Sequence, residues 1–266
     1  MAILQATVFS KSLMRNVPLT VILPVDKLMA SAKKEYPTLY LLHGIYGNTL
    51  DWLTNTRINR WAMERDLCVV LPSGENSYYL DDPAHFDHWS RFVGQELVEL
   101  TRRMFPLSDR REDTFIGGRS MGGYGALYNG LNYRETFSWI LAFSPALRIR
   151  QLQNSTYESG LILSNRAFAE RVFGDLDALP TSDRNPIWQV RQLAEAGETV
   201  PSIYLACGDR DELMPGSREL DEVLSACNLP HTFDILPGAH EWDFWDRALE
   251  KSLNVLPLGR RKNSNR

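Results

Sequence analysis

Short apolar runs rich in β-branched residues recur along the chain, and the stretches between them place apolar residues at helical spacing. This alternation favours a mainly parallel sheet whose strands are buried on both faces. We expect the first two runs to form an antiparallel pair and the others to form the central sheet. The predicted strands are residues 3–9, 18–23, 38–42, 67–71, 114–116, 139–143, 203–206 and 232–236.

Helical spacing is clear in residues 91–105, where Phe92, Leu97, Leu100 and Met104 fall near one face. The predicted fold class is therefore α/β, with a mostly parallel central sheet and helices on both faces. The predicted helices are residues 55–65, 91–105, 121–131, 217–226 and 242–253.

Residues 148–200 interrupt this rhythm, because they hold many polar and turn residues and no clear strand. One interpretation is a cap-like insertion above the sheet that shapes a binding pocket. A surface insertion of helices that contacts no ligand explains the same pattern equally well.

The length of 266 residues and the hydrophobic content of 44% suit one domain over residues 1–258. The net charge of −4 gives no broad positive field, so nucleic acid is not an expected partner. The basic end, residues 259–266, has too few apolar residues to fold and is predicted to be a disordered tail.

Cysteine usage and the lack of targeting signals bear on location. Cys68, Cys207 and Cys227 are odd in number and widely spaced, which argues against a disulfide framework and for a reducing compartment. The first residues do not resemble a signal peptide, and no apolar run is long enough to span a bilayer. We therefore predict a soluble, cytoplasmic protein without a membrane span.

The sequence Gly118-Arg119-Ser120-Met121-Gly122 lies between a predicted strand and a predicted helix. In that context G-x-S-x-G is typical of the nucleophile elbow of the α/β-hydrolase fold, where glycines allow a tight turn that presents the serine. The positive end of the following helix favours negative charge beside the serine. Ser120 is therefore the predicted nucleophile.

A serine nucleophile needs a base and an acid that orients the base, and in this fold they follow in the order serine, acid, histidine. Two histidines follow Ser120. His231 begins a predicted strand, whereas His240 lies in the loop after it, so His240 is the predicted base. Asp211 stands a few residues past the glycine that ends the preceding strand and is the predicted acid, with Asp209 as the alternative.

Acyl transfer also needs N–H donors for the developing oxyanion. The backbone N–H of Met121, directly after the nucleophile, is one predicted donor. The loop after residues 38–42 contains glycines that allow close approach to a substrate, and the N–H of Ile45 in this loop is the second. His43 opens the loop, and its ring is expected to brace the loop rather than act as a base.

Aromatic side chains supply candidates for the substrate pocket, and we select Trp52, Tyr79 and Trp242. His85 and His88 stand near several aspartates and raise the alternative of a metal site. Their spacing does not match a known zinc-binding helix. We therefore expect no metal and no other cofactor.

Further motifs are spread along most of the chain. They are Tyr40-Leu41-Leu42-His43-Gly44 with Asp51-Trp52, Asn76-Ser77-Tyr78-Tyr79-Leu80-Asp81, Glu96-Leu97, Phe105-Pro106-Leu107, Arg111-Glu112-Asp113-Thr114-Phe115-Ile116, Ser120-Met121-Gly122-Gly123-Tyr124-Gly125-Ala126, Cys207-Gly208 with Asp211, and Gly238-Ala239-His240-Glu241-Trp242. Together they resemble the tributyrin esterase and esterase D group of α/β-hydrolases. This group includes S-formylglutathione hydrolases, feruloyl and acetylxylan esterases, and mycolyltransferases.

The resemblance implies Asp211 rather than Asp209 as the acid, and it supports Ile45 and Met121 as the oxyanion donors. One departure is Arg119, where the related branches carry leucine or histidine. An arginine beside the nucleophile either favours an acidic substrate or pairs with a nearby carboxylate, and the sequence leaves both open.

The sequence thus predicts a serine carboxylesterase that hydrolyses short-chain acyl esters through an acyl-serine intermediate. Its expected partner is a small-molecule ester, and a homo-oligomer stays open. An S-formylglutathione hydrolase-type thioesterase with the same three residues is the first alternative. A noncatalytic binding protein of this fold is the second, although such a protein would normally have lost one of the three.

Overall fold

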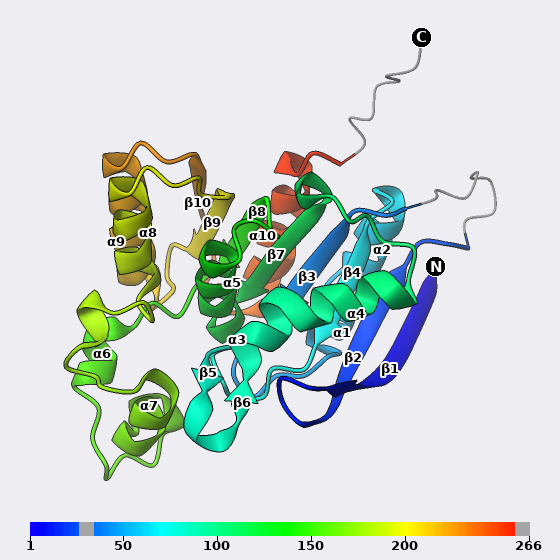
Figure 1. Cartoon of the computed structure of the whole chain (residues 1–266). Helices are drawn as coiled ribbons and strands as arrows, with labels where there is room; N and C mark the ends of the chain where they lie inside the picture. Colours follow the sequence, from blue (N-terminus) through cyan, green and yellow to red (C-terminus); the bar gives the residue numbers. More distant parts are fainter. Residues whose placement is uncertain (27–34, 259–266) are drawn as a thin grey trace.

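An eight-stranded sheet runs through the molecule (Figure 1). The computed structural model describes residues 1–26 and 35–258. The strands are β1 (Ala2–Ser10), β2 (Arg15–Leu23), β3 (Thr38–Leu42), β4 (Cys68–Pro72), β7 (Thr114–Arg119), β8 (Trp139–Phe143), β9 (Ser202–Gly208) and β10 (His231–Leu236). They lie in the order β1-β2-β4-β3-β7-β8-β9-β10. Only β2 runs antiparallel to its neighbours within this sheet, so the predicted mostly parallel arrangement is confirmed.

The central strands are apolar on both faces. Every residue of β3 and β4 is buried. Tyr40 and Leu42 of β3 join one core cluster, whereas Leu39 and Leu41 join the other. This alternation follows from the strand pleat, and it explains why a central strand reads as an unbroken apolar run in the sequence.

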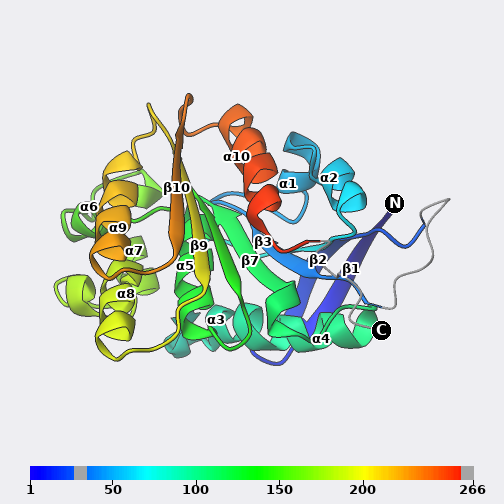
Figure 2. The ribbon, with the colours of Figure 1, turned by 90° about the horizontal axis from the view of Figure 1, so that it is seen from above.

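Helices cover both faces of the sheet (Figure 2). One face carries α1 (Asp51–Asn55), α2 (Ile58–Glu64) and α10 (Trp242–Val255). The other carries α3 (Trp89–Arg91), a π-helical turn (Phe92–Glu96), α4 (Leu97–Met104), α5 (Met121–Asn132) and α9 (Met214–Ala226). The predicted α/β-hydrolase class, with helices on both faces, is confirmed.

The predicted helix over residues 55–65 is wrong at its start. α1 ends at Asn55 and α2 begins only at Ile58, because Thr56 is extended. Two contacts stabilise the break: Thr56 Oγ1 accepts the Ile58 N–H at 3.3 Å, and the Arg57 N–H donates to Asp246 Oδ1 at 2.9 Å. The second contact comes from α10, so a local pattern could not reveal it.

Residues 148–200 form α6 (Ile149–Gln153), α7 (Arg166–Phe173) and α8 (Pro186–Glu195), joined by turns. Two of these helices begin at residues that favour a helix start in the sequence. Asn165 caps α7 by accepting the Phe168 N–H, and Asn185 caps α8 by accepting the Ile187 N–H. Asparagine is a favoured cap, and the proline that follows Asn185 suits a first helical turn.

Within residues 1–26 and 35–258, no helix is both long and apolar enough to cross a bilayer. Cys68, Cys207 and Cys227 are free thiols. The predicted tail, residues 259–266, lies outside the described residues.

Candidate active site

A tight turn between β7 and α5 presents Ser120. Its backbone has φ 54° and ψ −118°, a conformation that a residue with a side chain rarely adopts. Glycines make the turn sterically feasible: a Cβ on Gly118 would lie 2.4 Å from the Gly122 carbonyl oxygen, and one on Gly122 would lie 2.5 Å from the Leu42 carbonyl oxygen. The chain therefore forms the strand–turn–helix elbow that the G-x-S-x-G pattern predicts.

Three predicted side chains meet beside this turn. Ser120 Oγ lies 3.0 Å from His240 Nε2. On the other side of the ring, His240 Nδ1 lies 3.0 Å from Asp211 Oδ2 and 3.2 Å from Asp211 Oδ1. The three residues follow the C-terminal ends of β7, β9 and β10, the edge of a parallel sheet where functional groups collect.

The Asp211 carboxylate determines which nitrogen of His240 carries the proton. Burial raises the pKa of Asp211, but hydrogen bonds from the side chains of His240 and Ser144 and from the Leu213 N–H outweigh it, so the pKa lies below its ordinary value. An ionised carboxylate only accepts hydrogen bonds, so Nδ1 of His240 donates to it. Nε2 is then left to accept the hydroxyl proton of Ser120.

Asp209, the alternative acid, lies elsewhere. Its Oδ1 accepts the Gly238 N–H at 2.9 Å, and its side chain is 50% exposed. A Cβ on Gly208 would lie 2.4 Å from the Gly238 carbonyl oxygen, so the loops after β9 and β10 touch here. Of the two candidates, Asp211 contacts the His240 ring, whereas Asp209 braces the loop that carries His240.

His43 ties the loop after β3 to its surroundings. Its Nδ1 donates to the Gly44 carbonyl oxygen at 2.7 Å, and its Nε2 accepts the Gly74 N–H at 2.9 Å. The residue is 1% exposed, and burial lowers its pKa. Because both nitrogens are bonded to the backbone of a buried site, the ring is neutral and braces the loop.

The loop after β3 packs against the start of α5. A Cβ on Gly122 would lie 2.6 Å from the His43 carbonyl oxygen, which shows how closely the two backbones approach. Met121 is the first residue of α5, and the first N–H groups of a helix have no partner within it. Ile45 follows two residues after His43 and is half-buried. These amides stay the predicted oxyanion donors.

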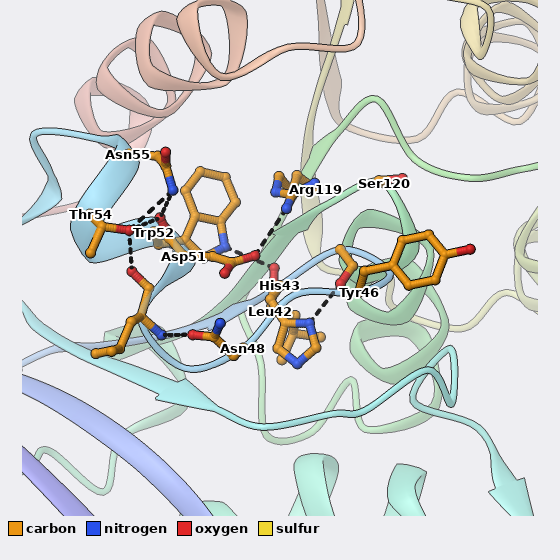
Figure 3. Close-up of polar contacts among 12 residues, drawn as sticks. Leu42, His43, Tyr46, Asn48, Asp51, Trp52, Thr54, Asn55, Arg119 and Ser120 are labelled. Atoms are coloured by element: carbon orange, nitrogen blue, oxygen red, sulfur yellow. Dashed lines mark hydrogen bonds and ion pairs between the residues drawn. The ribbon is translucent and has the colours of Figure 1, made fainter.

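Tyr46 lies in the loop after β3, next to Ile45, and is not among the residues predicted from the sequence. Its side chain is 70% exposed, its φ is 60°, and its N–H donates to Asn76 Oδ1 at 2.9 Å. Figure 3 shows its ring projecting from the loop on the side where Ser120 is drawn. Its place in the glycine-containing loop after a central strand was the available signal, because aromatic residues in such loops can contact a substrate.

Arg119 is paired inside the protein. Its Nη2 lies 3.0 Å from Asp51 Oδ2 (Figure 3). Its Cζ lies 4.2 Å from the ring centroid of Trp242 and 4.5 Å from that of Trp245. Burial lowers the pKa of Arg119, and the Asp51 carboxylate opposes that effect. Of the two interpretations that the sequence left open, the structure shows the ion pair.

Two of the three residues predicted to line the substrate pocket, Trp52 and Tyr79, are buried instead. Trp52 is 1% exposed and donates its indole N–H to the Leu42 carbonyl oxygen at 2.9 Å. Tyr79 is 0% exposed and donates its hydroxyl to the His43 carbonyl oxygen at 3.0 Å. Both support the loop after β3 from below and have no surface for a substrate. Trp242 is half-buried against Arg119, and its contact with substrate stays a prediction.

The histidines that raised the metal alternative pair with carboxylates. His85 Nδ1 lies 2.7 Å from Asp82 Oδ2, and His88 Nδ1 lies 3.8 Å from Asp81 Oδ2. These aspartates and histidines belong to a short hairpin, β5 (Asp81–Asp82) and β6 (Asp87–His88). In the described part of the chain, no group of three or more His, Cys, Asp or Glu side chains is placed to hold a metal ion.

Known proteins resemble this chain over nearly its whole length. Residues 10–256 match the esterase family described as "Putative esterase". The acetyl esterase of Caldicellulosiruptor saccharolyticus is 42% identical over 261 residues, which cover 96% of this chain and 98% of that protein. The chain belongs to the esterase family. It is a carboxylic ester hydrolase, as the sequence predicted.

Two solved structures of serine hydrolases have nearly the same fold as this esterase. FphF, a fluorophosphonate-binding serine hydrolase of Staphylococcus aureus solved with substrate bound, superposes with a TM-score of 0.84 at 26% identity, covering 96% of this chain and 98% of that one. FrmB, an S-formylglutathione hydrolase of S. aureus, gives 0.83 at 26% identity and the same coverage. The predicted relation to S-formylglutathione hydrolases is confirmed.

Proposed function

We propose that this esterase hydrolyses short-chain carboxylic esters through an acyl-serine intermediate, with Ser120 as nucleophile, His240 as general base and Asp211 as the orienting acid. The observation that carries the proposal is the continuous chain of hydrogen bonds from Ser120 Oγ through His240 to Asp211, with both contacts at 3.0 Å. A serine hydroxyl is a weak nucleophile at neutral pH, and this chain lets its proton leave as the oxygen attacks.

In the acylation step, Ser120 Oγ attacks the ester carbonyl carbon while His240 Nε2 accepts the hydroxyl proton. Asp211 stabilises the resulting imidazolium. The tetrahedral intermediate then collapses, the carbon–oxygen bond to the alcohol breaks, and the alcohol leaves with the proton from His240. Water attacks the acyl-serine with help from the same base, and the carboxylic acid and free Ser120 are released. The chain supplies the nucleophile, the base and the oxyanion donors, and the ester and water are the reactants.

The oxyanion donors in this mechanism are the N–H groups of Ile45 and Met121. The close packing of the loop after β3 on Gly122 supports this assignment, because it holds the two backbone segments together. The N-terminal end of α5 adds a favourable dipole for negative charge. Loss of one such donor costs about 10²- to 10³-fold in kcat in serine hydrolysis.

A short acyl group is supported by the C. saccharolyticus relative, which is named an acetyl esterase. The likeness to the S. aureus S-formylglutathione hydrolase supports a second candidate, the hydrolysis of a thioester of that class. Both reactions need the same nucleophile, base and oxyanion donors, so the difference lies in the pocket. A noncatalytic role is disfavoured because the three side chains are present and hydrogen-bonded.

Kinetics on p-nitrophenyl esters of increasing chain length, with S-formylglutathione measured alongside, test the proposal. We expect the highest kcat/KM with the shortest acyl group. Ser120→Ala should lower kcat by on the order of 10⁵- to 10⁶-fold, the loss typical when the nucleophile of a serine triad is removed. Fluorophosphonate should label the wild-type chain and not this variant. Near-normal turnover by the variant would refute the assignment, and preference for the thioester would favour the second candidate.

We also infer that residues 1–258 form one α/β-hydrolase domain with residues 148–200 as its cap. Buried side chains of α6, α7 and α8 belong to the same core cluster as one face of the sheet. Arg184 joins the cap to the domain, since its Nη2 donates to the Asp81 carbonyl oxygen at 3.0 Å and its own carbonyl oxygen accepts the Tyr124 hydroxyl. These contacts support a cap packed on the sheet domain.

A further inference from the structure

The guanidinium of Arg119 touches two segments besides its own. On one side is the loop after β3: a Cβ on Gly44 would lie 2.5 Å from Arg119 Nη1 and 3.0 Å from Cζ. On the other side is the start of α10, where Trp242 and Trp245 present their rings to Cζ. Arg119 therefore lies between the loop that carries Ile45 and the segment that follows His240.

Asp51 connects Arg119 to the turn around Ile45. A Cβ on Gly47 would lie 2.3 Å from Asp51 Oδ2, so the carboxylate packs directly on that glycine. The Gly47 N–H donates to the Gly44 carbonyl oxygen at 3.0 Å and closes the turn that contains Ile45. The Asp51–Arg119 ion pair thus lies against both ends of this turn.

Trp245 connects Arg119 to the proposed triad. Its ring centroid lies 4.8 Å from that of His240, with the planes at 90°. Its indole N–H donates to Ser144 Oγ at 3.2 Å, and Ser144 in turn hydrogen-bonds to Asp211. A shift of the guanidinium would therefore disturb the Trp245 ring against which His240 packs.

Stability alone does not account for this arrangement. Arg119 is 9% exposed, and its Nε has no hydrogen-bond partner among the described residues. A buried charge with an unmatched donor is costly, and apolar side chains in place of a buried ion pair often leave a protein as stable or more so. Its paired and stacked guanidinium also leaves little surface for an acidic substrate.

We propose that Arg119, held by Asp51 and stacked on Trp242 and Trp245, is a positioning residue that fixes the oxyanion loop relative to the catalytic histidine. This inference rests on the proposed esterase mechanism. Arg119 acts through Gly44 and Trp245 and need not touch the substrate. Its removal should therefore affect the chemical step more than substrate binding.

The test uses Arg119→Leu, Arg119→Lys, Asp51→Asn and the double variant Asp51→Asn/Arg119→Leu, with p-nitrophenyl acetate as substrate. Arg60→Leu is the matched control, because Arg60 pairs with Glu64 on the exposed surface of α2. Fluorophosphonate titration gives the concentration of competent enzyme in each sample. If fluorophosphonate fails to label Ser120 in the wild-type chain, the proposed function itself fails, whatever the variants do.

We expect Arg119→Leu to lower kcat per labelled site by about 10- to 100-fold, below the full loss of an oxyanion donor, with KM changed less than about threefold. Lysine should restore only part of the rate, because it lacks the planar group that stacks and pairs at once. The double variant should be no slower than the slower single variant. Provided that fluorophosphonate labels the wild-type chain, any of three results would overturn the inference. They are an unchanged kcat in Arg119→Leu, a change in its KM alone, or a loss in the double variant equal to the sum of the two single losses in free energy.

Discussion

Trp245 packs at right angles against His240, with ring centroids 4.8 Å apart. The same indole donates to Ser144 Oγ, and Ser144 hydrogen-bonds to Asp211, so one side chain supports both the ring and the carboxylate of the proposed triad. The chain makes this contact locally, because α10 begins at Trp242 and its first turn places Trp245 beside the preceding loop.

Replacement of Trp245 should separate these two contacts. Trp245→Phe keeps an aromatic ring and loses the bond to Ser144, so we expect kcat to fall about fivefold, the effect of one hydrogen bond of about 1 kcal/mol. Trp245→Ala also loses the ring contact, worth about 1 kcal/mol more, and should fall about 30-fold. Trp188→Phe in α8 is the control. Equal rates for the two Trp245 variants would contradict the division.

The residues of the proposed triad could be picked out in the sequence because each one follows a run that the sequence predicts as a strand. Ser120 lies in a glycine-flanked turn, and chain order then limits the base and the acid to a few residues near the ends of later strands. The preference for Asp211 over Asp209 came from its place past the turn glycine and from the resemblance, since both residues stand in one short loop. The structure separates them through their contacts with His240 and Gly238.

Other features depend on contacts between distant residues, which no local pattern reveals. The carboxylate that pairs with Arg119 lies 68 positions away, and the one that interrupts the first helical segment at Arg57 lies 189 positions away. Trp52 and Tyr79 were misplaced for a related reason: an aromatic residue beside a catalytic loop suits both a pocket and the packing beneath it. Only the three-dimensional fold shows which side of the loop each ring occupies.

Asp211 and Asp209 offer a matched pair of substitutions. Asp211→Asn should lower kcat by about 10⁴-fold, because an amide no longer selects the His240 tautomer that accepts the serine proton. Asp209→Asn keeps an oxygen that can accept the Gly238 N–H, so we expect a change below about threefold. Steady-state kinetics on p-nitrophenyl acetate at neutral pH compare them. A larger loss in the Asp209 variant would reverse the assignment of the acid.

His43 should make the stability of the protein depend on pH. Its folded-state pKa is lowered by burial, so between that value and the unfolded value of about 6.5 the unfolded chain binds more protons. The contribution is fully present above about pH 6.5 and is lost as the pH falls toward the folded-state pKa.

Urea unfolding at pH 7.5, 6.5 and 5.5 measures this effect. As the pH is lowered, the free energy of unfolding of the wild type should decrease more steeply than that of His43→Asn, which has no titrating group at this position. His85→Asn is the control, because the His85 side chain is 62% exposed and pairs with Asp82 at the surface. If the His43 variant and the wild type show parallel pH dependence, the buried neutral ring is not the cause.

Gly122 should be essential for both stability and rate, although alanine is normally the better helix former. Alanine gains about 1 kcal/mol of helix propensity over glycine, but its Cβ would lie 2.5 Å from the Leu42 carbonyl oxygen and 2.6 Å from that of His43. Both obstacles are backbone atoms at the end of β3, so no side-chain rotation relieves them. Overpacking of this kind costs about 1–3 kcal/mol, which exceeds the gain.

Gly122→Ala should therefore lower the free energy of unfolding, and it should lower kcat because the displaced loop carries the Ile45 amide. Gly160→Ala is the matched control, since a Cβ there would meet no atom within 4 Å and should leave stability equal or slightly higher. Urea unfolding and turnover of p-nitrophenyl acetate give both quantities. If Gly122→Ala loses stability but keeps its kcat, the packing of α5 on β3 does not fix the position of the loop that carries Ile45. The assignment of Ile45 as an oxyanion donor would then fail.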